Sequence, residues 1–212
     1  QEISISLGGG DDVFLDPTNY LITLETPVRI DGGTGNDTIK GSEADDVILG
    51  GDGDDVLLGD LGADVIDGGA GDDKVTGDSR KYDVSFSYPD TLRGGAGFDM
   101  LSWPETWEWI YIDLNGSAAT PGVNAGDTLA GDFEGAEARA IFATLIGNDA
   151  DNVLIAGDVI EGRGGDDTLI AWDGGVKLDG GPGDDKLTVN EAGPHPPPAP
   201  NTLDGGDNAT AA

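Results

Sequence analysis

The 212-residue chain has no cysteine, one histidine, one methionine and only ten lysine and arginine residues. Without cysteine it can form neither disulfide bonds nor thiolate zinc sites. Ten basic residues against 42 acidic ones give a net charge of −32, which excludes the basic patches that nucleic acid and anionic membrane surfaces require. No run approaches about 18 consecutive apolar residues, so we expect no membrane span.

Aspartate and glycine are present in excess. The 33 Asp and 37 Gly make up about a third of the sequence, and both residue types favour turns over the interiors of helices and strands. Acidic chains with few aromatic residues are often disordered, but the spacing argues against disorder here. Five nonapeptides run without a gap from residue 32 to 76: GGTGNDTIK, GSEADDVIL, GGDGDDVLL, GDLGADVID and GGAGDDKVT. Aspartate holds the sixth position of each repeat and an aliphatic residue the eighth.

This period predicts an all-β protein, a parallel β-roll or β-helix solenoid. The first six residues of a repeat are expected to turn, with backbone carbonyls left free of internal hydrogen bonds, and the last three to form a short strand with one inward side chain. Two repeats make an 18-residue coil. Coils stacked about 4.8 Å apart give two parallel sheets with the aliphatic residues between them.

The stacking also predicts cation binding. Loops of alternate repeats share an edge, so Asp37, Asp55 and Asp73 are expected on one edge and Asp46 and Asp64 on the other. Their carboxylates would repel one another unless a hard divalent cation lies between the loops, with turn carbonyls completing an all-oxygen shell. Calcium fits best, because magnesium demands a tighter octahedron and zinc prefers nitrogen or sulfur ligands.

The run of residues 32–76 resembles the GGxGxDxUx repeat of RTX proteins, the hemolysin-type calcium-binding nonapeptide. The resemblance implies a parallel β-roll that folds on binding several calcium ions, roughly four to eight, and that leaves the cell by type I secretion. It implies an extracellular or cell-surface location, with the periplasm as an alternative.

The resemblance also implies the ligands, namely the sixth-position Asp of both loops and four loop carbonyls. The first set is Gly33, Gly35, Asp37, Gly50, Asp52 and Asp55. The second is Gly51, Gly53, Asp55, Gly68, Ala70 and Asp73. The third, on the other edge, is Ser42, Ala44, Asp46, Gly59, Leu61 and Asp64. The fourth is Arg163, Gly165, Asp167, Gly180, Pro182 and Asp185. Asp99 is a further candidate, whereas we expect no site centred on Val176. We expect the fifth-position acids Asp45, Asp54, Asp72, Asp166 and Asp184 to be exposed.

The repeats predict five regions. Residues 1–31 form an N-terminal cap with a degenerate repeat at 8–14. Residues 32–102 form the first β-roll block, with an irregular strand at 80–93. Residues 103–146 form a Trp-rich β insertion or capping segment, in which Trp103 and its neighbours are expected to cover the open end of a sheet between the two blocks. Residues 147–190 form the second block, and residues 191–212 a Pro-rich tail with a truncated repeat.

No zinc-protease HExxH or lipase GxSxG motif is present, and the one histidine, His195, lies in a proline tract. We therefore predict a non-catalytic, secreted calcium-binding module. Two alternatives remain. One is an assembly subunit that docks a protein partner through Trp103, Trp107, Trp109 and Tyr111. The other is the C-terminal portion of a secreted hydrolase.

Overall fold

The computed structural model describes residues 3–15, 26–78, 88–103, 109–115, 126–130, 132–140, 142–172, 175–190 and 201–206. The described residues form twenty strands, and all strand pairings are parallel. They contain no helix long and apolar enough to cross a bilayer. The predictions of an all-β fold and of parallel stacked sheets are confirmed.

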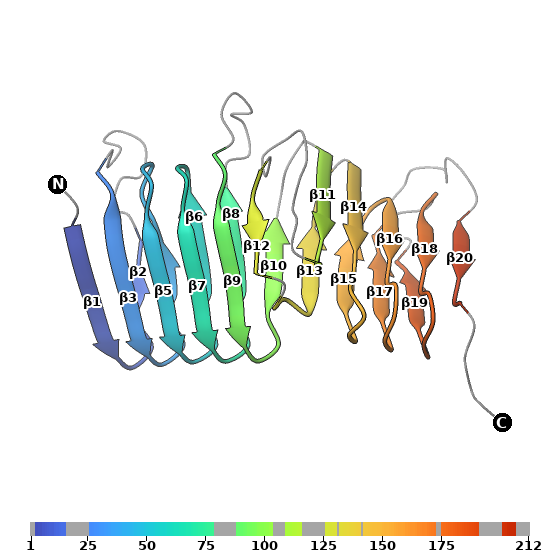
Figure 1. The fold of residues 1–212 in the computed structure, drawn as a ribbon, viewed down its shortest axis with the longest axis horizontal. Helices are drawn as coiled ribbons and strands as arrows, with labels where there is room; N and C mark the ends of the chain where they lie inside the picture. The colour runs from blue at the N-terminus through green and yellow to red at the C-terminus, as the bar shows by residue number, and fades with distance from the viewer. Residues whose placement is uncertain are drawn as a thin grey trace.

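The strands form three sheets (Figure 1). Sheet A contains β1 (Ile3–Gly9), β3 (Val28–Thr34), β5 (Val47–Asp52), β7 (Val65–Ala70), β9 (Thr91–Ala96) and β12 (Thr128–Leu129). Sheet B contains β2 (Val13–Phe14), β4 (Thr38–Lys40), β6 (Val56–Asp60), β8 (Lys74–Asp78), β10 (Met100–Trp103), β13 (Gly135–Ala138), β15 (Val153–Ala156), β17 (Thr168–Ala171) and β19 (Lys186–Val189). Sheet C contains β11 (Trp109–Asp113), β14 (Phe142–Ile146), β16 (Val159–Glu161), β18 (Lys177–Asp179) and β20 (Thr202–Asp204).

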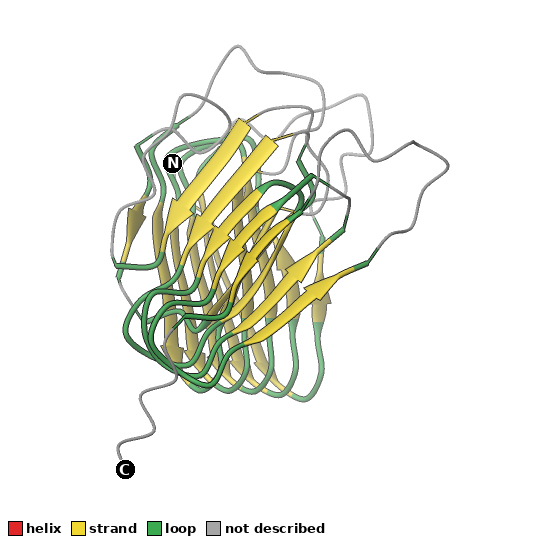
Figure 2. Cartoon of the chain, turned by 90° about the vertical axis from the view of Figure 1, so that its right-hand side faces the viewer, coloured by secondary structure: helices red, strands yellow, loops and turns green. Residues whose placement is uncertain are grey.

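Sheet B runs the whole length of the solenoid and faces sheet A in the N-terminal half and sheet C in the C-terminal half (Figures 1 and 2). The segment predicted as an insertion, residues 103–146, contributes strands to all three sheets: β12 to sheet A, β13 to sheet B, and β11 and β14 to sheet C. Strand β13 pairs with both β10 and β15. The nine-stranded sheet therefore passes from one repeat block to the next without a break.

The eighth-position residues stack in register between the facing sheets. In sheet A, Ile30, Ile48, Ile66 and Leu92 are direct neighbours on successive strands and are fully buried. Sheet B carries the matching row, which is Ile39, Leu57, Val75, Leu101, Ala136, Leu154 and Leu169. A fully buried aliphatic side chain contributes roughly 2 kcal/mol. Each coil formed by β5 to β8 has only two such positions, whereas strands of the C-terminal half such as β11 and β15 each bury two apolar side chains. The apolar core of the regular coils is therefore thin for the length of chain that it must order.

The strands of sheet A are longer than the sequence predicted. Strands β3, β5 and β7 continue through the first three positions of the repeat, with Gly33 paired to Gly51 and Gly51 to Gly69. The third-position carbonyls are not free either, since Asp52 O accepts the Gly35 N–H at 2.8 Å. The prediction that these turns lack hydrogen bonds is wrong, because Gly-rich backbone can pair with the same backbone one coil away.

The two edges of the solenoid differ. We call the first edge the side where sheets A and C lead into sheet B, at the bottom of Figure 1. The second edge is the opposite side, where sheet B leads back. Between described strands of facing sheets, the longest sequence separations, residues 15–27, 79–90 and 190–201, join strand ends on the second edge. Described strands of facing sheets that follow one another at the first edge are separated by at most six residues.

Gly33→Ala tests how closely the coils approach each other. Gly8 and Gly33 share a φ of 104°, but a Cβ at Gly33 would collide with the Gly8 carbonyl oxygen, whereas a Cβ at Gly8 would meet nothing within 4 Å. Gly8→Ala should cost only the left-handed strain of about 1–2 kcal/mol, and Gly33→Ala should cost clearly more. Denaturant unfolding of both variants at a fixed cation concentration measures the difference. Equal losses would contradict the close contact.

Candidate metal centres

A ladder of acidic side chains follows the first edge. Each rung is the residue before a strand of sheet B, and the rungs are Asp12, Asp37, Asp55, Asp73, Asp99, Glu134, Asn152, Asp167 and Asp185. The backbone N–H of each aspartate donates to the carboxylate of the next rung, as from Asp37 to Asp55 Oδ1 at 2.7 Å and from Asp55 to Asp73 Oδ1 at 2.8 Å. The N–H to carboxylate bonds continue from Asp73 to Asp99 and from Asp167 to Asp185. The sixth-position residues are therefore aligned along the stack.

The second carboxylate oxygen of most rungs has no partner. One Oδ2 atom is buried without a hydrogen bond in each of Asp12, Asp37, Asp55, Asp64, Asp73, Asp90, Asp99, Asp127, Asp167 and Asp185. Most of these residues are almost completely buried, with Asp37, Asp55 and Asp73 each 1% exposed. A buried ionised oxygen without a partner is strongly destabilising, so it must be neutralised by a proton or by a cation.

The raised pKa values of the ladder carboxyls reflect the same cost of burying a charged oxygen without a partner. Burial raises the pKa of Asp73, Asp99 and Asp167 to about 6. On the second edge burial raises the pKa of Asp90 to about 7 and that of Asp64 to about 9. In each case the rung N–H bond lowers the pKa and neighbouring carboxylates raise it further.

The first and second predicted sets lie on two successive steps of this ladder. Their loops pair in register, and Gly33, Gly35, Gly51 and Gly53 all have positive φ, between 104° and 133°. Gly50 and Gly68 pack against the orphan oxygens of Asp55 and Asp73. Carbonyl oxygens have two lone pairs, so Asp52 O and Ala70 O can accept an N–H and still face a cation. Two carboxylates with several carbonyls form the hard, all-oxygen donor set that calcium requires.

The fourth set has the same arrangement. The Asp167 N–H donates to Asp185 Oδ1 at 2.9 Å, and both residues keep an orphan Oδ2. Arg163 stands at a position held by glycine in the first two sets, yet it adopts φ 79°, and Gly165 follows at 99°. Gly180 packs against the Asp185 carboxylate, and Pro182 lies in the same loop.

The third set differs. Asp46 and Asp64 are brought together, with the Asp46 N–H donating to Asp64 Oδ1 at 2.8 Å. However, both oxygens of the Asp46 carboxylate have partners. The carboxylate accepts the Ser42 N–H at 2.5 Å and the Ser42 hydroxyl at 3.0 Å within its own loop, and the Val28 N–H of the preceding coil at 2.8 Å. Among the described non-glycine residues only Asp60 and Arg163 have positive φ, so Ser42 and Ala44 do not adopt the backbone conformation of the first two sets. Of this pair, only Asp64 offers an oxygen without a partner.

Two substituted rungs carry the ladder across the middle of the chain. The Asp99 N–H donates to Glu134 Oε2 at 2.9 Å, and Asn152 reaches the Glu134 carbonyl through its side-chain amide at 3.2 Å. Glu134 was not predicted from the sequence, because no nonapeptide surrounds it. The stacking of Asp99 on Asp73 was not predicted either, since 26 residues separate the two instead of 18.

On the second edge, Asp90 and Asp127 were likewise not predicted from the sequence. The Asp64 N–H donates to Asp90 Oδ1 at 2.9 Å, and the Asp90 N–H donates to Asp127 Oδ1 at 3.0 Å. Both residues are followed two positions later by a buried leucine, Leu92 and Leu129. That spacing of an acid and an aliphatic residue was the signal that could have found them. Farther along this edge, Val176 is buried at 2% exposure and has no oxygen to offer in its side chain.

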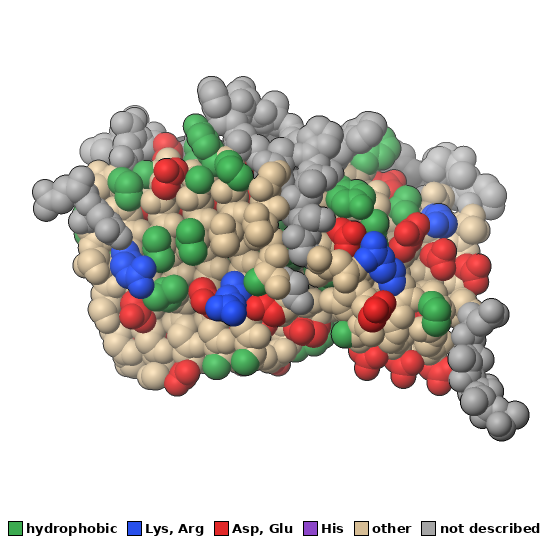
Figure 3. Space-filling view, in the orientation of Figure 1, with side chains coloured by type: hydrophobic (Ala, Val, Ile, Leu, Met, Phe, Trp, Pro, Cys, Tyr) green, Lys and Arg blue, Asp and Glu red, His purple; other side chains and the backbone are tan. Residues whose placement is uncertain are grey.

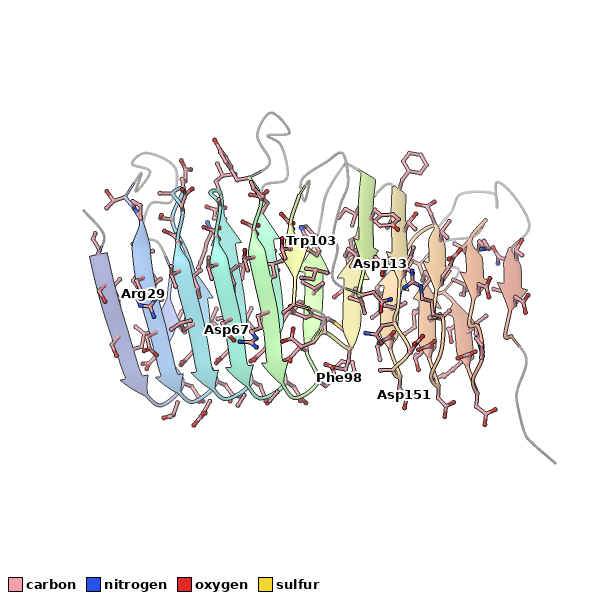
Figure 4. The ribbon with its side chains drawn as sticks, viewed as in Figure 1. Arg29, Asp67, Phe98, Trp103, Asp113 and Asp151 are labelled. Atoms are coloured by element: carbon pink, nitrogen blue, oxygen red, sulfur yellow. The ribbon has the colours of Figure 1, made fainter. Side chains whose placement is uncertain are left out.

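The fifth-position acids form a second, outer ladder. The Asp72 N–H donates to Asp54 Oδ1 at 2.9 Å and the Asp184 N–H to Asp166 Oδ1 at 2.8 Å, in the opposite direction to the inner ladder. These side chains are exposed, and acidic residues line the lower edge of the C-terminal half, where Asp151 is labelled (Figures 3 and 4). They hold neighbouring loops together as well as contributing charge.

Of the aromatic residues Trp103, Trp107, Trp109 and Tyr111, the structure describes the side chains of Trp103 and Tyr111. Trp103 is 2% exposed and belongs to the buried core, so its side chain is not available to a docking partner in this structure. Tyr111 is half-buried on β11, on the side opposite to the buried Ile110 and Ile112. Trp107, His195 and residues 80–87 of the irregular strand predicted over 80–93 lie outside the described residues, and the structure describes only the backbone of Trp109.

Within the described ranges, no group of three or more His, Cys, Asp or Glu side chains is arranged to hold a metal. Each candidate centre therefore consists of two stacked carboxylates and the backbone carbonyls around them.

Comparison with known proteins agrees with this geometry. The family model described as RTX calcium-binding nonapeptide repeat (4 copies) matches residues 29–57, 49–79, 86–102, 144–169 and 155–187, together just over half of the chain. These ranges contain all four candidate sets and exclude residues 103–143. No catalytic domain is identified. A search of curated proteins found no match.

The raised pKa values predict how the metal-free protein responds to pH. Folded pKa values of about 6 to 9 lie above the ordinary 3.8, so the folded state retains protons that the unfolded state releases. Its stability should therefore fall as the pH rises from 3.8 through these folded values, because each buried carboxyl then becomes charged. The folded fraction in chelator, followed by far-ultraviolet circular dichroism from about pH 8 to about pH 5, measures this trend and should increase toward the lower pH. Bound calcium replaces those protons, so its stabilising effect should grow over the same interval. Stability that rises with pH in chelator would contradict the assignment.

Proposed function

The chain belongs to the RTX calcium-binding nonapeptide repeat family, and we propose that it acts as a secreted β-roll module whose folding is driven by extracellular calcium. The observation that carries the proposal is the row of buried aspartate oxygens without hydrogen-bond partners, one for nearly every coil. Calcium placed between successive rungs would neutralise these oxygens and join the loops that carry them.

We assign calcium to the first, second and fourth sets. We assign a further ion to the loops of Asp73 and Asp99, which share the same glycine pairing, Gly69 with Gly95, and the same N–H to carbonyl bond, from Gly71 to Ala96 at 2.9 Å. Calcium at the third set would have to displace the contacts between Ser42 and Asp46, so we expect binding there to be weakest. Several ions per chain follow, in the range of four to eight expected from the sequence.

The charge of the chain supports a switch between compartments. Thirty-two net negative charges on 212 residues oppose compaction, and the apolar core is thin. Extracellular calcium modules bind with dissociation constants of about 10⁻⁴ to 10⁻³ M, so the chain would stay expanded at cytosolic calcium levels and would fold after export. The role is structural and binding, since the family match is to a repeat module and no catalytic domain is identified.

Asp55→Asn tests the role of calcium directly. Asp55 belongs to both the first and the second set, and asparagine keeps the Oδ1 atom that accepts the Asp37 N–H while removing the charge. We expect the calcium concentration at the folding midpoint, followed by far-ultraviolet circular dichroism, to rise at least tenfold. The matched control is Asp54→Asn, which removes the same charge from an exposed neighbour and should shift the midpoint little. Equal shifts in both variants, or a fully folded spectrum in excess chelator at about pH 8, would contradict the proposal.

A further inference from the structure

We propose that the second edge holds a cation site that no nonapeptide encodes, between the stacked carboxylates of Asp64 and Asp90. The inference rests on the proposed calcium function but assigns a residue pair that neither the repeat spacing nor the candidate sets contain. Asp64 holds the sixth position of an intact nonapeptide, residues 59–67. Asp90 follows it by 26 residues, after the connection that contains residues 79–87, and is preceded by Tyr88 and Pro89 instead of a glycine-rich turn.

The stacking of the two residues matches that of the first edge. The Asp64 N–H donates to Asp90 Oδ1 at 2.9 Å, as each rung of the first edge does to the next. The next rung repeats the contact, since the Asp90 N–H donates to Asp127 Oδ1 at 3.0 Å. The register lost in the sequence is thus recovered in space.

The oxygens left over point to a ligand. Asp64 and Asp90 are each 1% exposed, and the Oδ2 atom of each is buried without a hydrogen-bond partner. Gly59 packs against Asp64 Oδ2 and Gly77 against Asp90 Oδ2, just as Gly50 and Gly68 pack against the matching oxygens of the first edge. Two adjacent anionic oxygens cannot both remain ionised in such an environment without a cation.

The backbone around the pair supplies the remaining donors. Asp60 and Gly62 have φ values of 88° and 118°, close to the 104° and 119° of Gly33 and Gly35. Their carbonyls, together with the Gly77 carbonyl and the two carboxylates, make five oxygen donors for calcium. The Asp60 side chain is engaged by Lys40 at 2.9 Å, so only its carbonyl belongs to the site.

The position of the site gives it a distinct role. Gly77 and Asp90 lie on either side of the connection between β8 and β9, the first interruption of the repeat after residue 76. A cation held there joins both ends of that connection to the preceding coil. It would thereby restore the register that places β9 beside β7 and Asp99 on Asp73.

Asp90→Asn in the full chain tests the site by equilibrium dialysis of calcium at saturation. Asparagine keeps the acceptor for the Asp64 N–H and removes the charge, so we expect at least one fewer ion bound per chain. Asp45→Asn is the matched control, because Asp45 is an exposed acid on the same edge, and it should leave the count unchanged. An unchanged count in Asp90→Asn would mean that protons neutralise the pair and would overturn the inference.

Terbium provides a second readout that does not depend on the folding of an Asp90 variant. Tyr88 lies two residues from Asp90 and is 39% exposed, so it should sensitise the luminescence of a terbium ion bound there. Tyr88→Phe should lower tyrosine-excited emission without changing the number of ions bound. Emission that is independent of Tyr88 would overturn the site. Asp55→Asn separates the two claims: if it loses ions and Asp90→Asn does not, only this inference fails, and if neither loses ions, the proposed function fails as well.

Discussion

The structure depends on a stack of buried carboxylates in which one oxygen accepts a backbone hydrogen bond and the other has no hydrogen-bond partner. Oδ1 of each aspartate after the first accepts the backbone N–H of the preceding rung and so fixes the register between coils, as for Asp55 and Asp73. Asn152 is the exception, since its Oδ1 accepts the Asn148 N–H of its own loop. Oδ2 faces inward with no donor. The hydrogen-bonded half of each carboxylate builds the solenoid, and the other half makes the solenoid unstable without a counter-ion. In the coils formed by β5 to β8 only two aliphatic residues per coil are buried, and they cannot offset that cost by burial alone.

The sequence predicts this interaction wherever the period is intact. Spacing alone placed the sixth-position acids on two edges and the eighth-position aliphatics inside, because stacking identical coils converts a nine-residue repeat into columns of identical residues. It failed where the period is interrupted. The connection over residues 79–90 adds eight residues, so Asp73 and Asp99 are 26 residues apart and yet adjacent in space. Glu134 stays in the ladder only because a longer side chain reaches the same N–H, and no period encodes that substitution.

Backbone conformation was the other part that the sequence did not reveal. Glycine at the second and fourth positions suggested turns, but Gly33 and Gly51 pair across coils as strand residues. In the opposite sense, Arg163 and Asp60 adopt positive φ without being glycine, whereas Ser42 and Ala44 do not. The difference matters for the chemistry, because at Ser42 the loop bonds to its own aspartate and uses up the oxygens that a cation would need. Composition alone therefore overestimates how alike the candidate sites are.

The two edges of the solenoid differ in their rung residues and in the length of their connections. On the first edge all nine rungs are acids except Asn152, and the connections are short. On the second edge the acids include Asp46, Asp64, Asp90 and Asp127 beside sheet A and Asp158 beside sheet C, where Asp158 Oδ2 accepts the Ala143 N–H at 2.9 Å. Farther along this edge the equivalent positions are uncharged: Val176, and Asn201, whose side chain still accepts the Gly175 N–H at 2.6 Å. A connection inserted on one edge lengthens the loop without separating the rungs on the other edge, because the strands of sheet B remain paired throughout. The long connections can therefore vary on the second edge while the first edge keeps an almost unbroken row of carboxylates.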